Sequence, residues 1–424
     1  MERYSTYKPS VVPGQKEIPA HWKEILNGIL FKENVRKPKE DDIPLSLSQK
    51  DGLIPTELMK ESSLKTSSYD NWKRVVKHDL VLNRFKAHLG VLMASDYEGM
   101  VSFHYGVYEP RMPLVTKYYE LLYHTDVYKG IYAYTSNGMT VGLQNLSNLA
   151  FYSIKGIYPP LAEQENIVSY LESKTSKIDA YVADKEKEIL LLQELKQKTI
   201  AEAVTKGLNP NVKMKEYNSL ISSQCPEHWK IMRNKSFLSL TGEKVGNRTN
   251  EYTLLSLTTK GVIVRDLESG KGKFPKEFDT YQIVKKDDLV FCLFDIDETP
   301  RTVGLVNTEG MITGAYTALK VNQSIALPEY VYCYYLCVDD IKALKPYYSG
   351  LRKTVRADKF LQLYLPLPPL DEQQTIVSYI EEKCQKIDTL ITELQAEIDY
   401  LKEYKQRLIA DVVTGQVNVQ SINI

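Results

Sequence analysis

Several groups of side chains in this sequence are of types that catalyse reactions or bind metals. Asp295, Asp297 and Glu298 form an acidic cluster whose carboxylates could hold a divalent cation, as in a nuclease. A solvated acidic loop is the commoner meaning of such a run. Cys333 and Cys337 stand four residues apart in a Tyr-rich stretch, where packing in a core is the default for cysteine. We therefore expect no catalytic residues and no metal site.

The histidines and glycines add no further support for chemistry. His78, His88, His104 and His124 lie in one stretch but lack the paired spacing of metal ligands. The sequence contains no Gly-x-x-x-x-Gly-Lys-Ser/Thr phosphate loop, and no Asn/Asp-Pro-Pro-Tyr/Phe run of the kind that adenine methyltransferases use. We therefore expect no cofactor, and binding of neither ATP nor S-adenosylmethionine.

The composition is that of a soluble protein with two or three domains. The chain has 424 residues, zero net charge, 30 tyrosines and five scattered cysteines without a Cys-x-x-Cys pair. It has no apolar run long enough to cross a membrane and no signal peptide, so we expect a cytoplasmic protein. A neutral chain cannot bind nucleic acid by overall charge, so such contact would need local patches, polar readout or a partner.

Two stretches have the periodicity of long amphipathic helices, and they are copies of each other. Pro159–Val204 and Pro368–Val413 are offset by 209 positions, and about half of their residues are identical. Both begin with Pro-Pro-Leu-x-Glu-Gln, contain Lys-Ile-Asp and end with Ala-x-x-Val-Thr shortly before a glycine. Matched apolar positions alone could arise in any two heptad helices, but these matched polar motifs could not.

The repeat extends into the stretches that precede the helices. Pro19-Ala20-His21-Trp22-Lys23 returns as Pro226-Glu227-His228-Trp229-Lys230. The blocks 20–157 and 227–366 contain short β-rich runs separated by Gly, Asn, Asp and Ser, which predicts mixed α/β domains. The two blocks share framework residues, but the stretches between those residues differ. We therefore expect the two blocks to perform similar tasks on different targets.

This set of motifs, in this order over the whole chain, resembles the specificity subunit of type I restriction–modification systems. The resemblance implies a non-catalytic reader of double-stranded DNA. It implies that two methyltransferase (modification) subunits dock on the helices and that restriction subunits can join the complex. It also implies that each domain reads one half of a split, asymmetric DNA target.

The fold expected from the repeat and the resemblance is α+β. Two globular mixed α/β target-recognition domains would be separated by two long helices, which form an antiparallel coiled coil with an internal pseudo-twofold repeat. Such helices would act as a ruler between two DNA readers. The expected boundaries are a first recognition domain over 1–157, a first spacer helix over 158–207, a linker over 208–226, a second recognition domain over 227–366, a second spacer helix over 367–415 and a tail over 416–424.

Base reading requires polar side chains on loops that reach a DNA groove, because Arg and Lys pair with guanine while Asn and Gln pair with adenine. An exposed polar loop without a DNA role is the commoner meaning of such residues. The candidates in the first block are Ser48, Gln49, Lys50, Arg84, Lys86, His104, Tyr105, Asn137 and Gln144. Those in the second block are Thr258, Thr259, Lys260, Arg301, Tyr316, Arg352, Lys353 and Arg356.

Two other functions remain open from the sequence. A coiled-coil scaffold that binds only proteins would account for the neutral net charge. A nuclease would have to use the acidic cluster at 295–298. Salt-dependent, sequence-selective DNA binding by the assembled complex would exclude the scaffold, and cleavage by the purified chain with magnesium alone would be needed to support the nuclease.

Overall fold

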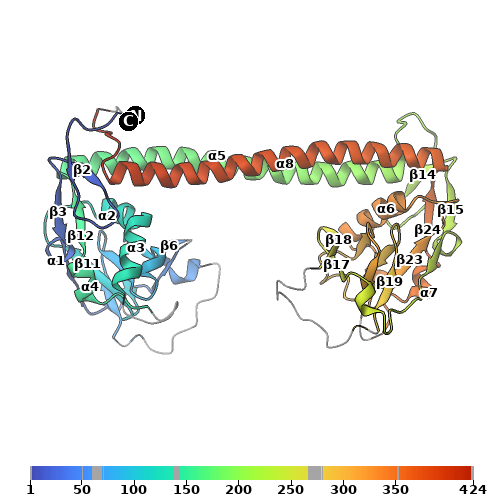
Figure 1. Ribbon diagram of the computed structural model, residues 1–424, viewed down its shortest axis with the longest axis horizontal. Coiled ribbons are helices and arrows are strands. Elements are labelled where there is room, and N and C mark those ends of the chain that lie inside the picture. Colours follow the sequence, from blue (N-terminus) through green and yellow to red (C-terminus); the bar gives the residue numbers. More distant parts are fainter. Residues whose placement is uncertain are drawn as a thin grey trace. The chain divides into compact units, whose positions relative to one another are not determined.

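The computed structural model describes residues 2–49, 51–59, 69, 71–136, 144–265, 278, 280–350 and 353–421. The chain divides into two compact units, residues 1–186 with 395–424, and residues 187–394. Each unit contains one mixed α/β domain and about half of each long helix, α5 (Leu161–Lys206) and α8 (Leu370–Val413) (Figure 1). Each domain therefore packs with parts of both helices.

The first domain is built on a four-stranded antiparallel sheet with smaller strand pairs around it. The sheet has the order β4 (Phe31–Glu33), β11 (Tyr105–Pro110), β8 (Leu80–Asn83), β9 (Leu92–Ala94). The antiparallel pairs are β1 (Tyr7–Pro9) with β2 (Glu17–Pro19), β3 (Lys23–Leu26) with β12 (Lys155–Tyr158), β5 (Leu45–Ser48) with β6 (Gly52–Pro55), and β7 (Lys73–Val75) with β10 (Gly99–Val101). The short helices are α1 (Asn27–Leu30), α2 (Thr116–Tyr123), α3 (Asp126–Thr135) and α4 (Asn148–Ser153).

The second domain repeats this order of pairing. Its sheet has the order β16 (Leu238–Leu240), β23 (Thr317–Val321), β20 (Leu289–Phe291), β21 (Val303–Leu305). The antiparallel pairs are β13 (Met214–Glu216) with β14 (Gln224–Pro226), β15 (Lys230–Arg233) with β24 (Tyr364–Leu367), β17 (Leu255–Thr258) with β18 (Gly261–Val264), and β19 (Gln282–Val284) with β22 (Gly310–Ile312). The helices are α6 (Pro328–Asp340) and α7 (Ala357–Phe360).

The expected fold class and internal repeat are confirmed by this matching topology. In each four-stranded sheet, the strand that comes first in the chain pairs with the strand that comes last. The last strand then pairs with the second, and the second pairs with the third. The stretch 208–226, which the sequence suggested as a linker, contains the β13–β14 hairpin, and this hairpin is the counterpart of β1–β2 in the first unit. The domain boundaries themselves stay a prediction.

Tyrosine, abundant in the sequence, fills both cores. In the first unit, Tyr118, Tyr123 and Tyr128 are fully buried, and their hydroxyl groups donate to Val413 O, Asn27 Oδ1 and Lys155 O. Buried Tyr330, Tyr334 and Tyr335 take the equivalent place in the second unit. A tyrosine adds apolar area while its hydroxyl group can satisfy a backbone acceptor, so these rings also tie helix ends to the domains.

Two of the repeated sequence motifs meet in space, once in each unit. The Glu163 carboxylate at the start of α5 accepts hydrogen bonds from Trp22 Nε1 at 2.9 Å and contacts His21 Nε2 at 2.7 Å. In the second unit, Glu372 accepts from Trp229 Nε1 at 3.0 Å and contacts His228 Nε2 at 2.7 Å. The motifs Pro-x-His-Trp and Pro-Leu-x-Glu therefore attach each domain to its following helix.

The glutamine that follows each of these glutamates is buried and bonded to the domain. Gln164 Oε1 accepts from Val115 N at 2.9 Å, and its amide group donates to Pro159 O. Gln373 Oε1 accepts from Leu327 N at 2.7 Å, in the same way. A buried amide group that is fully bonded fixes the angle at which the helix leaves the domain.

The Lys-Ile-Asp motif pairs the two long helices. Within the first unit, Asp179 of α5 accepts from Lys405 Nζ of α8 at 2.6 Å and 2.7 Å. Within the second unit, Asp388 of α8 accepts from Lys196 Nζ of α5 at 2.7 Å. Each aspartate of the motif thus meets a lysine of the repeated Lys-Gln pair (Lys196 or Lys405) in the other helix, which fixes an antiparallel register in each unit.

Both long helices end in a left-handed glycine beside a tryptophan. Gly207 has φ = 73° and lies near Trp229, while Gly415 has φ = 74° and lies near Trp22. The chain continues past Gly415 alongside the N-terminal segment, where Asn418 N donates to Glu2 O at 2.9 Å. Among the residues that the structure describes, no helix is both long and apolar enough to cross a membrane.

Candidate nucleic-acid interface

Three loops of the first domain meet in one place. The loop between β8 and β9 includes the short 3-10 helix Ala87–Leu89, and Gln49 from the β5–β6 turn donates through Nε2 to Leu89 O at 3.2 Å. The ring of Phe85 in the same loop lies 5.7 Å, between centroids, from the ring of His104 in the β10–β11 loop. The candidates Gln49, Lys86 and His104 therefore belong to one cluster.

The turn between β5 and β6 is shaped by one of its own candidates. Ser48 Oγ accepts from Asp51 N at 2.8 Å and donates to Asp51 Oδ2 at 3.1 Å. Gly52 closes the turn with φ = 75°. Ser48 thus positions the exposed Gln49 beside it, while Lys50 lies outside the described residues.

Exposed aromatic rings lie at the surface of this cluster of loops. Phe85 and Phe103 are 42% and 50% exposed, and the His104 ring lies on Phe103 with centroids 3.9 Å apart at an angle of 37°. Lys86 is exposed beside Phe85. Exposed aromatic rings next to a cation can stack on bases or wedge between base steps while the cation contacts phosphate. We name Phe85, Lys86, Phe103 and His104 the aromatic tip.

Arg84, by contrast, is engaged inside the domain. Its guanidinium group donates through Nη2 to Glu33 Oε1 at 2.5 Å and to Asn148 Oδ1 at 2.7 Å. Lys73 Nζ reaches the same Glu33 oxygen at 2.8 Å, and Asn148 also donates to Glu33. Arg84 therefore braces the strands under the aromatic tip.

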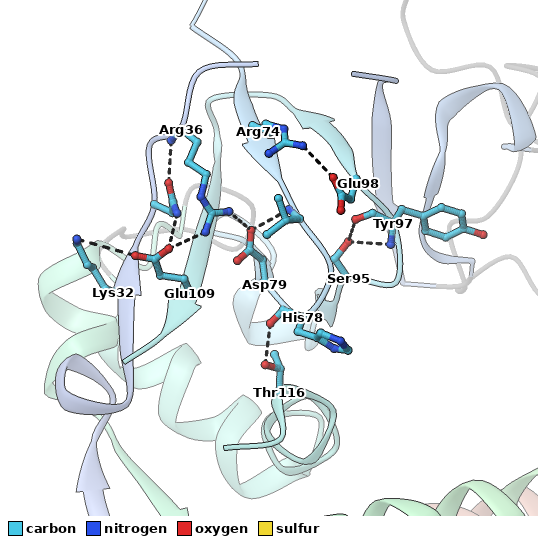
Figure 2. Close-up of polar contacts among 12 residues, drawn as sticks. Lys32, Arg36, Arg74, His78, Asp79, Ser95, Tyr97, Glu98, Glu109 and Thr116 are labelled. Atoms are coloured by element: carbon cyan, nitrogen blue, oxygen red, sulfur yellow. Dashed lines mark hydrogen bonds and ion pairs between the residues drawn. The ribbon is translucent and has the colours of Figure 1, made fainter. Parts of the chain in front are cut away.

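A second polar network supports the same sheet. Arg36 donates to Asp79 Oδ2 at 2.9 Å and to Glu109 Oε2 at 2.6 Å, and Figure 2 shows this guanidinium group between the two carboxylates. Asp79 also accepts from Val76 N at 2.9 Å. Burial raises the pKa of Asp79, and the hydrogen bond from Val76 and the charge of Arg36 oppose that shift. The network is structural, because the Asp79 side chain is only 2% exposed.

Two of the remaining candidates of the first domain, Tyr105 and Gln144, are partly buried. Tyr105 packs against the cluster around Val81 and Val107, and burial raises its pKa. Gln144 is half-buried, and its Oε1 atom has no hydrogen-bond partner among the described residues. Asn137 lies outside the described residues.

In the second domain, the β17–β18 turn matches the β5–β6 turn. Thr258 Oγ1 accepts from Lys260 N at 3.1 Å and donates to Gly261 O at 3.0 Å, and Gly261 has φ = 93°. Thr259 and Lys260 are exposed at its end. The predicted correspondence between this turn and Ser48-Gln49-Lys50 therefore holds for the turn residues that are described in both domains.

Arg301 is engaged in the second domain much as Arg84 is in the first. It donates through Nη1 to Asp339 Oδ2 at 3.1 Å and to Asp340 Oδ1 at 3.0 Å on α6. Asp339 is buried and also accepts from Thr302 and Lys342. The Arg301 side chain, 20% exposed, thus holds the β20–β21 loop on α6.

A second loop contacts the acidic cluster of Asp295, Asp297 and Glu298. Lys353 Nζ lies 3.5 Å from Asp297 and 3.1 Å from Glu298, and Tyr348 donates to Asp297 Oδ1 at 2.9 Å. The Tyr348 hydrogen bond is the main cause of a lowered pKa of Asp297, and the charge of Lys353 acts in the same direction. Asp295 has φ = 45° and its N donates to Lys353 O, so this loop pair is tightly specified. The described residues contain no group of side chains that could hold a metal.

Two further candidates of the second domain, Tyr316 and Arg356, lie in the part of the chain that the structure describes. The rings of Tyr316 and Phe294 stack with centroids 6.2 Å apart, and burial raises the pKa of Tyr316. Arg356 is exposed and pairs with Asp358 at 3.0 Å. Arg352 lies outside the described residues. The structure therefore places Tyr316, Arg301 and Lys353 in contacts that hold loops, whereas Thr259, Lys260 and Arg356 are exposed.

Comparison with known proteins agrees with the motifs. Residues 226–400 match the family described as the type I restriction modification DNA specificity domain. The type I restriction enzyme MjaVIII specificity subunit of Methanocaldococcus jannaschii is 22% identical over 303 residues, which are 66% of each chain. The MjaX specificity subunit of the same organism is 22% identical over 431 residues, or 96% of each chain. Together these matches support a type I specificity subunit.

Solved structures show the same fold for the specificity subunit. The HsdS subunit from Thermoanaerobacter tengcongensis has a TM-score of 0.53 at 15% identity, covering 96% of this chain and 100% of that one. A chain from a structural study of complex assembly and conformational transition of the type I R-M system has a TM-score of 0.69 at 14% identity, covering 94% and 99%. Like its relatives, this specificity subunit is non-catalytic.

Reasoning from the sequence missed two residues of the specificity subunit that the structure makes candidates. Phe85 and Phe103 are large, apolar and exposed, and both flank predicted candidates in the chain. Their position beside Arg84, Lys86 and His104 was the available signal. Base reading was predicted from side chains that can form hydrogen bonds, and phenylalanine has none to offer.

Proposed function

We propose that this specificity subunit reads an asymmetric, bipartite target in double-stranded DNA, one half per domain. In this proposal two methyltransferase subunits dock on its long helices, restriction subunits can join them, and the assembly works in the cytoplasm. One observation carries the proposal. The two domains share one sheet topology but differ in the loops that this topology presents.

The loop difference is sharpest at the aromatic tip. Phe85 corresponds to Phe294 by the offset of 209, but alignment of β10 (Gly99–Val101) with β22 (Gly310–Ile312) matches Phe103 and His104 with Gly314 and Ala315. A shared framework with unequal loops suits two readers of unequal sequences. The names of the relatives, which are specificity subunits of type I restriction enzymes, support DNA as the ligand.

The proposed contacts divide into two classes. Gln49, Lys86, His104, Thr259, Lys260 and Arg356 would contact DNA directly, joined by Phe85 and Phe103. Ser48, Arg84, Tyr105, Arg301, Tyr316 and Lys353 would position the loops that carry them. The half-buried Gln144 and the candidates Lys50, Asn137 and Arg352 stay predictions.

The proposal is tested with the complex of this chain and its methyltransferase subunit. We expect a gel shift that depends on sequence and weakens with salt, and a methylated motif in two unequal parts. The motif is read by methylome sequencing of cells with and without the chain. Binding of the methyltransferase subunit without any sequence-selective DNA shift would favour the protein scaffold instead.

Two neighbouring cations should respond differently to truncation. We expect Lys86→Ala to leave stability unchanged, to weaken DNA binding and to reduce the salt slope of binding by about one unit, because one phosphate contact is lost. We expect Arg84→Ala to lower the free energy of unfolding by about 1–3 kcal/mol, because Glu33 and Asn148 lose their charged partner.

The stability of the Lys86→Ala and Arg84→Ala variants is measured by urea unfolding. Their DNA affinity is measured by DNA titration of the complex at several salt concentrations. Lys77→Ala, a change of another lysine in the first domain, serves as the control for nonspecific loss of charge. A Lys86→Ala complex with the original salt slope would remove Lys86 from the proposed contacts.

A further inference from the structure

The β10–β11 turn of the first domain and the β22–β23 turn of the second domain are built in the same way. In the first domain Lys73 Nζ donates to Tyr105 O at 2.8 Å, and in the second Gln282 Nε2 donates to Tyr316 O at 2.7 Å. In both turns the backbone N–H group of the tyrosine also donates to the carbonyl group three residues earlier, at 3.0 Å and 3.2 Å. The two turns therefore share a frame, and they differ in the two residues that precede the tyrosine.

In the first domain, these two residues carry exposed rings. Phe103 is 50% exposed, and the His104 ring lies over one of its faces with centroids 3.9 Å apart. Phe85 of the β8–β9 loop adds a third ring, whose centroid lies 5.7 Å from that of His104. Phe103 is thus supported by a neighbouring ring while half of its own surface is open to solvent.

Hydrogen bonds hold the β8–β9 loop that completes the aromatic tip. Asn83 Oδ1 accepts from Phe85 N at 3.1 Å and from Lys86 N at 3.2 Å. Leu146 N donates to Arg84 O at 3.0 Å, which ties the loop to a later segment of the chain. A loop that is already ordered loses little conformational freedom on binding. The rings of the aromatic tip are therefore arranged before DNA arrives.

The second domain has a hollow beside the equivalent turn. Gly314 and Ala315 take the place of the two rings, and they border a surface hollow of about 370 Å³ whose lining includes Lys244 and Gln282. A Cβ atom added at Gly314 would lie 2.7 Å from the backbone oxygen of Thr280. This backbone therefore cannot accept a phenylalanine at the position that corresponds to Phe103.

The neighbouring loop of the second domain differs as well. The offset of 209 positions relates Phe85 to Phe294 and Lys86 to Asp295. Phe294 is half-buried and stacks on Tyr316, whereas Phe85 is exposed. Asp295 carries the opposite charge to Lys86. At these equivalent positions the second domain offers DNA neither an exposed ring nor a cation.

We propose that Phe103 inserts between two adjacent base pairs of the half-site that the first domain reads and unstacks them, whereas the second domain leaves its half-site stacked. This inference rests on the proposed function. An apolar ring that enters a base step replaces stacking between bases with stacking on the ring. The neighbouring Lys86 would contact a phosphate group and hold the ring at that step.

The insertion also indicates which sequence the first domain prefers. Pyrimidine–purine steps such as TA and CA/TG are the ones that unstack and kink most easily. We expect such a step at the point where Phe103 enters. At that position the first domain would recognise how easily the step deforms, without hydrogen bonds to base edges. The half-site of the second domain has no such requirement.

The experiment uses the complex of the full chain with its methyltransferase subunit, on duplexes that carry the motif found by methylome sequencing. 2-Aminopurine, whose fluorescence rises when it unstacks, replaces each adenine of either strand in turn, and each duplex is saturated with the complex. A methyltransferase extrudes its target base, so a rise at the methylated base is expected in both halves. We expect one further rise, at a pyrimidine–purine step in only one half of the motif.

Variants of the aromatic tip identify the source of the further rise. Phe103→Ala should abolish it and weaken binding to the motif about tenfold, because the stacking of one ring on a base is lost. Phe103→Leu keeps an apolar side chain that can enter the step, so it should keep the rise. Tyr134→Ala is the matched control, because it removes a 94% exposed ring of the same domain that lies at another hollow, beside Val11 and Lys155. It should change neither the signal nor the affinity, and thermal melting checks that every variant is folded.

A change in the DNA tests the origin of the preference. Replacing the pyrimidine–purine step with a purine–purine step should weaken binding of the wild-type complex about tenfold. The same replacement should weaken binding of the Phe103→Ala complex by less than about threefold, because this variant has no ring to insert. Equal losses for the two complexes would show that base edges are read at this step and would overturn the inference.

The outcomes separate this inference from the proposed function. The inference is overturned if the wild-type complex binds its motif selectively without a further rise, or with a further rise in both halves. It is also overturned if the rise persists in Phe103→Ala. Each of these results leaves the proposed function standing, because selective binding is retained. Absence of any sequence-selective binding by the wild-type complex overturns both.

Discussion

Gly415→Ala is expected to destabilise the first unit by about 3 kcal/mol or more. Gly415 has φ = 74°, and a left-handed backbone costs a residue with a side chain about 1–2 kcal/mol. The added Cβ atom would also lie 2.6 Å from Pro19 Cγ and 2.8 Å from Trp22 Cζ3. Pro19 and Trp22 belong to the packed segment that Glu163 holds on α5, so they cannot move aside cheaply. Urea unfolding of the full chain measures the loss.

The repeat supplies the matched control. Gly207 has φ = 73°, but a Cβ atom there would lie 3.1 Å from Glu372 Oε1 and 3.4 Å from Trp229 Cζ2. Gly207→Ala should therefore carry only the backbone cost of about 1–2 kcal/mol. If both substitutions cost the same, the packing of Pro19 and Trp22 against the end of α8 is not as close as the structure indicates.

Inserting one heptad into each long helix is expected to lengthen the spacer of the recognised DNA motif. The equivalent insertion points follow Glu186 in α5 and Gln395 in α8. Seven residues add about 10 Å to a helix at ~1.5 Å per residue, which corresponds to about three base pairs. A heptad keeps the apolar seam in phase, so the helices can still pair. The prediction rests on the proposal that the length of the helices sets the distance between the two readers.

Methylome sequencing of cells that carry the variant chain reads the spacer directly. Inserting the heptad into α5 alone serves as the control, because the Asp179–Lys405 and Asp388–Lys196 pairs could not form together. That variant should yield no methylation. If the chain with both insertions still directs methylation of the original motif with an unchanged spacer, the length of the helices does not set the distance between the two readers.

The repeat made most of the fold predictable from the sequence. An offset of 209 positions identified both helices, and the motifs at Glu163 and Glu372 marked where each domain attaches. The pattern also placed a glycine, Gly207 or Gly415, just after each helix, and the structure shows that both are left-handed. The expected antiparallel pairing also implies that each unit combines the first half of one helix with the second half of the other, as the structure shows. What the sequence did not reveal is the exact register, in which Asp179 meets Lys405 and Asp388 meets Lys196.

The candidate site was harder to predict, for a specific reason. An arginine on a loop has the same appearance in sequence whether it is free or paired. Arg84 meets Glu33 from a strand 51 positions earlier, and Arg301 meets Asp339 from a helix 38 positions later. Such pairings follow from strand and helix packing, which residue type alone does not encode. Exposure of Phe85 and Phe103 likewise depends on which loops the sheet brings together.

The hydrogen bond from Tyr118 to Val413 joins residues 295 positions apart, and Asn418 pairs with Glu2 near the start of the chain. The first unit therefore requires residues that are translated after the whole second unit, although its domain is synthesised first. The second unit is one continuous segment, 187–394, and all of its contacts are available earlier. Contacts across a long loop form slowly because loop closure costs entropy. Synthesis thus reverses the order of the domains. The second domain translated is the first able to complete its core, and the first domain lacks part of its helix packing until the residues after 394 are translated.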